Sequence, residues 1–91
     1  MNYNGSSVAR MRLEAGLTQA RAARLIAAKM KRRSLSASYL RHIERGRERP
    51  SVKLRSAMAD VYKVSVTRMT TALANERRHF LRGLREAERE G

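Results

Sequence analysis

The sequence contains no cysteine, a single proline and only four aromatic residues among its 91 residues. Without cysteine there is neither a disulfide framework nor a thiolate metal site, and two histidines do not make a zinc site. No apolar run approaches the roughly 18–20 residues of a membrane-spanning helix. The few aromatic side chains argue against RNA recognition by base stacking. We therefore expect no metal, no cofactor and no membrane partner.

Acidic residues are also scarce. Eight Asp and Glu stand against 21 Lys and Arg, for a net charge of +13. Most of the basic residues are arginine, whose planar fork binds phosphate through two parallel hydrogen bonds. The balance favours a polyanionic partner, although a compositional bias toward arginine would give the same count. The scattered acids form no nucleophile–base–acid set, so we expect no enzyme.

Serine and threonine residues divide the chain into helices. Each of five precedes apolar residues at helical spacing and can serve as an N-cap: Ser6 (or Ser7), Thr18, Ser36, Ser51 and Ser65. Gly16 and Gly46 follow the first and third helices, where a left-handed residue ends a helix. No segment alternates as a strand does. We predict an all-α domain of about five helices after a flexible arm, residues 1–5.

Five short motifs occur in a specific order. They are Leu17-Thr18-Gln19, Ala22-Ala23, Ile43-Glu44-Arg45-Gly46, Pro50-Ser51 and Val64-Ser65-Val66. In this order the sequence resembles the Cro/repressor-type helix-turn-helix family, also called XRE-like, over roughly residues 8–73. The resemblance implies a lambda-repressor-like bundle over 6–74 and a helical extension over 75–91. It also implies a sequence-specific transcriptional regulator of the cytoplasm that binds double-stranded DNA, most simply as a repressor.

By this resemblance, helix 36–45 would lie in the major groove and read bases. Leu40 and Ile43 point inward by their spacing, which leaves an outward face. The expected base-reading residues on that face are Ala37, Ser38, Tyr39, Arg41 and His42. Arg41 can contact guanine in a bidentate manner. Tyr39 could instead be a packing residue, and His42 a plain exposed histidine.

Further polar residues would hold the DNA backbone. Those expected from the motifs are Thr18, Gln19, Ser36, Arg45, Arg47, Arg49 and Lys53. The chain between the "LTQ" and "IERG" motifs is roughly seven residues longer than the family spacing, whose turn is about 3–4 residues. The extra residues fall within 27–35, so either the second helix is longer or a basic loop forms. A loop would place Lys31, Arg32 and Arg33 near phosphate, or leave them solvated.

One acidic residue stands out within the basic first half of the chain. The resemblance implies that Glu44 is structural and pairs with a basic residue of the first helix. Arg12 occupies that place, so we expect an Arg12–Glu44 ion pair that braces helix 36–45.

The segment beyond residue 74 is too apolar for a solvated tail. Phe80, Leu81 and Leu84 are expected to form a homodimer interface, which suits binding to an inverted repeat, or else to fold back on the core. Two other functions remain open. An antitoxin would bind a protein toxin through this last helix, and a nucleoid protein would coat DNA without sequence preference.

Overall fold

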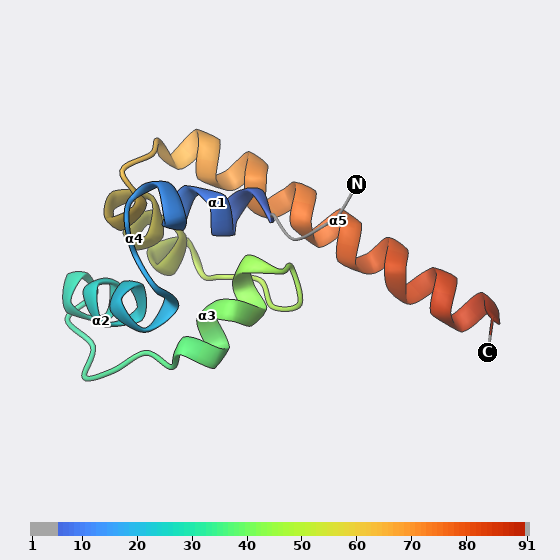
Figure 1. The fold of residues 1–91 in the computed structure, drawn as a ribbon, viewed down its shortest axis with the longest axis horizontal. Helices are drawn as coiled ribbons and strands as arrows, with labels where there is room; N and C mark the ends of the chain where they lie inside the picture. Colours follow the sequence, from blue (N-terminus) through green and yellow to red (C-terminus); the bar gives the residue numbers. More distant parts are fainter. Residues whose placement is uncertain (1–5, 91) are drawn as a thin grey trace.

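A computed structural model describes residues 6–90 of the chain, and the expected arm over 1–5 lies outside the described residues. It contains helices α1 (Ser7–Glu14), α2 (Gln19–Lys29), α3 (Ala37–Glu44), α4 (Val52–Tyr62) and α5 (Val66–Glu90). The described residues include no strand. The expected all-helical bundle of five helices is confirmed (Figure 1).

Each helix begins where the sequence predicts. The five N-cap hydroxyls accept the backbone N–H of the residue three positions on, at 3.0–3.2 Å, and they belong to Ser6, Thr18, Ser36, Ser51 and Ser65. These bonds satisfy one of the donors that every helix start leaves unpaired. Local sequence therefore determines where the elements start.

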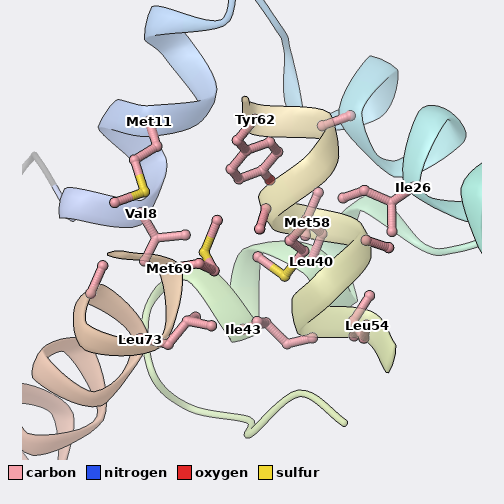
Figure 2. Close-up of a cluster of buried hydrophobic side chains, with 14 of the residues drawn as sticks. Val8, Met11, Ile26, Leu40, Ile43, Leu54, Met58, Tyr62, Met69 and Leu73 are labelled. Carbon is pink, nitrogen blue, oxygen red and sulfur yellow. The ribbon is translucent and has the colours of Figure 1, made fainter. Parts of the chain in front are cut away.

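The core lies where all five helices meet (Figure 2). Ile26 of α2, Leu40 of α3 and Met58 of α4 are completely buried there. Val8 of α1 and Met69 of α5 close the same cluster from the other side. Burying such side chains is the main favourable term for so short a chain.

A loop, rather than a longer helix, accounts for the extra residues between α2 and α3. Helix α2 ends at Lys29, and Lys31 then takes a left-handed conformation, φ +57°. The Arg32 N–H donates to the Ala27 carbonyl at 2.8 Å. Leu35 packs against the core at the far end of the loop. The loop is therefore attached at both ends, and its basic side chains are exposed between them.

Helix α5 is much longer than the others and continues through Gly83 without a break. Its first half packs beside α1 and α4, and its second half extends away from the bundle (Figure 1). The last buried residue on it is Glu76. This projection makes the chain elongated, with extents of 43 × 24 × 22 Å.

Candidate nucleic-acid interface

A buried carboxylate holds the rear of α3. Glu44 is 1% exposed, and its oxygens accept from Arg12 Nε at 2.9 and 3.2 Å. The Tyr62 hydroxyl donates to Glu44 Oε2 at 2.6 Å, and Gln19 Nε2 lies 3.5 Å from Oε1. The Ser6 hydroxyl donates to the Glu44 carbonyl at 2.9 Å. One residue of α3 is thus tied to α1, α2 and α4.

The charges in this cluster compensate one another. A buried carboxylate is costly unless it is paired and hydrogen-bonded, and the Arg12 guanidinium provides the opposite charge at 2.9 Å. Burial, followed by the charge of Glu44, raises the pKa of the Tyr62 hydroxyl well above its usual range. The Tyr62 hydroxyl therefore keeps its proton at neutral pH and can donate it to Glu44.

Sequence reasoning expected the Arg12–Glu44 pair, which the structure contains, but it missed Tyr62. The spacing of the sequence could have indicated Tyr62, because it follows Leu54 and Met58 at four-residue intervals on α4. All three residues are buried. A tyrosine that ends an apolar stripe needs a partner for its hydroxyl. Gln19, expected at the DNA backbone, also faces this cluster and is half-buried.

The outer face of α3 is free of such contacts within the described part of the chain. Leu40 and Ile43 are buried, and so the opposite side faces outward. Ser38 and Arg41 are exposed there and His42 is half-buried, while the half-buried Ala37 and the exposed Tyr39 lie at the two flanks of this face. Tyr39 is 37% exposed, so it lies outside the core, and its exposure is compatible both with contact to DNA and with the alternative of a partly buried packing residue.

Basic residues surround this face on two sides. Four follow α3 or begin α4, and three lie on the α2–α3 loop. All seven are exposed: Arg45, Arg47, Arg49 and Lys53, and then Lys31, Arg32 and Arg33. Thr18 and Ser36, also exposed, use their hydroxyl oxygens as helix caps. The starts of α2 and α3 combine these hydroxyls with the positive end of a helix dipole, a combination that favours anions.

Helix α5 fixes the other end of α3. Gly46 is left-handed, φ +82°, and a Cβ on it would lie 2.4 Å from the Glu76 carbonyl oxygen. Arg77 Nη1 donates to the Gly46 and Arg47 carbonyls at 3.0 and 2.9 Å. These contacts involve residues that the sequence placed in an extension. Only the fold, which brings residues 30 positions apart together, reveals them.

Glu76 also holds the start of α1. Its Oε2 accepts the Ser7 N–H at 2.8 Å and the Ser7 hydroxyl at 3.0 Å. Burial raises the pKa of the Glu76 carboxyl above its ordinary value, while the Ser7 N–H and the nearby His79 act in the opposite direction. The sequence offered no sign of this role, because Glu76 is separated from Ser7 by most of the chain.

The three apolar residues expected at a dimer interface lie on the projecting part of α5. Phe80 and Leu81 are half-buried, and Leu84 is 46% exposed. Between residues 6 and 90, no group of three or more His, Cys, Asp or Glu is placed to hold a metal ion. Over the same range, no helix has the length and apolar character needed to cross a membrane.

The arrangement is that of a helix-turn-helix protein: α2 packs beside the short helix α3, and the outer face of α3 is polar and accessible. The model of the helix-turn-helix domain family matches residues 5–72, which is most of the chain. The chain belongs to this family of DNA-binding domains. Comparisons with curated proteins and with solved structures gave no match.

Proposed function

We propose that the chain is a sequence-specific transcriptional repressor that acts in the cytoplasm on chromosomal or mobile DNA. One observation carries the proposal: α3 presents a polar, exposed face while its rear is tied to three other helices through Glu44. A reading helix needs both features, because base discrimination requires side chains held at defined positions. The family match supports DNA binding, and this geometry supports the reading of specific bases.

Arg41 is the principal base-reading residue. It is exposed on the outer face of α3, and no acid pairs with it within residues 6–90. A guanidinium contacts guanine O6 and N7 together and discriminates against other bases by about 1–3 kcal/mol. Ser38 and His42 can hydrogen-bond to several bases, Ala37 can contact a thymine methyl group, and Tyr39 can contact the sugar-phosphate backbone.

The surrounding basic residues contribute affinity instead of sequence preference. Thr18, Gln19 and Ser36 would position phosphates at the starts of α2 and α3. The loop and the α3–α4 turn would add charge contacts through Lys31, Arg32, Arg33, Arg45, Arg47, Arg49 and Lys53. Binding of this kind weakens with salt, because each neutralised phosphate releases counterions.

A dimer would place two copies of α3 on an inverted repeat. One copy of α3 reads only a few base pairs, and half-sites about one helical turn apart require a two-fold pair. Phe80, Leu81 and Leu84 follow Glu76, the last buried residue of α5, so a second copy can reach them. An antitoxin would use the same surface for a protein toxin.

Selection of bound duplexes from random DNA tests the proposal, with wild type and Arg41→Ala compared side by side. We expect an inverted repeat whose half-sites lose one base preference in the variant. Tight, salt-dependent binding by both proteins with no shared motif would instead identify a DNA-coating protein. Recovery of a single half-site with no repeat would support base reading by α3 and contradict binding as a dimer.

A further inference from the structure

A pocket of about 280 Å³ lies beside the end of α3, between the α3–α4 turn and helix α5. Four arginines line it, Arg49, Arg55, Arg77 and Arg78, together with one acid, Glu48. They come from the turn, from α4 and from α5, so only the folded chain brings them together. Four positive charges against one negative charge leave the pocket strongly electropositive.

The arginine donors in this pocket are mostly unused within residues 6–90. Arg55 Nε is buried and has no hydrogen-bond partner there. Arg77 uses Nη1 for the Gly46 and Arg47 carbonyls, and Arg78 uses Nη2 for the Asn75 side chain. Each guanidinium carries five donors, so most of them are available to a ligand. A buried N–H donor without a partner is uncommon, and it indicates that an acceptor such as a bound anion belongs beside it.

The walls of the pocket are formed by packed elements. Ile43 and Leu73 are core residues that line it, and Gly46 lies directly against the α5 backbone. Thr70 of α5 belongs to the same lining. The apolar and backbone walls of the pocket are therefore in place before any ligand arrives, which reduces the entropic cost of binding.

We propose that this pocket binds a phosphoryl oxyanion. Planar guanidinium forks match the geometry of phosphate oxygens and bind them through paired, charge-assisted hydrogen bonds. The volume is near the lower end of small-ligand pockets, which accommodates one phosphoryl group with a small substituent. The group can come from a DNA backbone phosphate or from a free phosphorylated molecule. The pocket involves none of the five base-reading side chains, so it does not depend on specific base recognition.

Bound phosphate would link the end of the recognition helix to α5. Its ligands lie on α5 and α4 as well as on the turn that directly follows α3. Occupation thus adds a bridge parallel to the Arg77–Gly46 contact. If the phosphate belongs to DNA, the pocket fixes the register of the protein on the duplex; if it is free, the ligand tunes how firmly α3 is held.

The test is an NMR titration of the full chain with inorganic phosphate at constant ionic strength, with chloride as the balancing anion. We expect saturable shifts of the Gly46 and Thr70 amides. Arg55→Gln and Arg78→Gln should each weaken binding about tenfold, the usual scale of a lost charge-assisted bond. Arg24→Gln, an exposed arginine on α2, should leave the affinity unchanged. Because Arg78 is exposed, its variant should remain folded even if Arg55→Gln does not.

Absence of saturation, or equal binding by all three variants and the wild type, would overturn the proposal. Repeating the titration on the duplex-bound protein identifies the source of the phosphoryl group. Loss of phosphate binding on DNA, with weaker duplex binding by Arg78→Gln, assigns the pocket to a backbone phosphate. Retained binding assigns it to a free ligand. Base preference is measured separately with Arg41→Ala. A failure of the proposed phosphate site can therefore be distinguished from a failure of the proposed base reading.

Discussion

At the scale of single residues, the stability of α3 depends on the partners of one carboxylate. Tyr62→Phe removes the hydroxyl that donates to Glu44 Oε2 at 2.6 Å and changes nothing else in the buried cluster. Hydrogen bonds to charged groups contribute about 1.5–3 kcal/mol, so we expect the free energy of unfolding to fall by that amount. Urea denaturation measures it.

Tyr39→Phe is the matched control, because Tyr39 is exposed and its hydroxyl has no partner within residues 6–90. Its free energy of unfolding should stay within about 0.5 kcal/mol of wild type. An equal loss of unfolding free energy in Tyr62→Phe and Tyr39→Phe would show that the hydrogen bond from Tyr62 to Glu44 does not stabilise the fold.

Glu76 makes the stability depend on pH in a direction unusual for an acid. Burial raises the pKa of its carboxyl in the folded chain, so the folded state binds a proton more readily than the unfolded state. Its contribution is therefore largest at low pH, where it is protonated in both states. That contribution declines as the pH rises from the ordinary value to the raised one, and is constant above it.

Glu76→Gln removes this titration. Urea denaturation of both proteins from about pH 4 to about pH 8 should show wild type losing stability relative to the variant as the pH rises. A difference that is constant over this range, or that grows in favour of wild type, would contradict the assignment.

At the scale of elements, two glycines distinguish backbone strain from a close approach between helices. Both are left-handed, Gly16 with φ +78° and Gly46 with φ +82°. A Cβ on Gly16 would meet nothing within 4 Å, whereas on Gly46 it would lie 2.4 Å from the Glu76 carbonyl oxygen. Gly16→Ala should cost about 1–2 kcal/mol for the conformation alone.

Gly46→Ala should cost about 2–5 kcal/mol, because overlap with the α5 backbone adds to the same conformational term. It should also weaken DNA binding more than Gly16→Ala, because α3 must shift away from α5. The free energies of unfolding and the duplex affinities of the pair provide the check. An equal loss of unfolding free energy in the two variants would mean that the α5 backbone moves aside without a measurable penalty.

The α2–α3 loop is the element expected to give salt dependence without base preference. Arg32→Gln with Arg33→Gln removes two exposed charges beside α3. If both contact phosphates, the slope of log K against log salt should fall by roughly 2. Binding isotherms at several salt concentrations measure the slope.

Arg10→Gln with Arg68→Gln is the control, since these arginines lie by a pocket between α1 and α5, away from α3. Its slope should match wild type. An unchanged slope in the loop variant would mean that the loop is solvated and does not bind DNA.

At the scale of the whole molecule, the question is what the projecting half of α5 does. Leu81→Gln with Leu84→Gln removes the apolar contacts there, whereas Arg82→Gln with Arg85→Gln alters exposed neighbours of the same helix. We expect wild type and the arginine variant to sediment as dimers and the leucine variant as a monomer, because loss of buried apolar area weakens association. Circular dichroism verifies that each remains folded.

The same leucine variant should bind a full inverted repeat much more weakly, and a single half-site unchanged, because only the linkage between two reading helices is lost. A wild-type protein that is monomeric at all concentrations would exclude the homodimer and favour a different protein at this surface.

The sequence by itself determined the starts of the helices, their caps and the inward side of α3. Capping hydroxyls and helical spacing are local properties, so Ser36, Leu40 and Ile43 were enough to define which face of α3 is outward. The resemblance to a known family supplied the Arg12–Glu44 pair, because both residues lie within residues 8–73, the stretch that the resemblance covers.

The tertiary structure alone decided what holds α3 in place and what lies behind it. Tyr62, Glu76 and Arg77 act on residues 18 to 69 positions away, and no local pattern specifies such pairings. It also resolved the choice that the sequence left open at residues 27–35 in favour of a loop. The arginine pocket exists for the same reason. Arginines that are far apart in sequence repel one another and come together only because the apolar faces of their helices pack. The hydrophobic effect depends on the apolar area buried and not on the charges nearby.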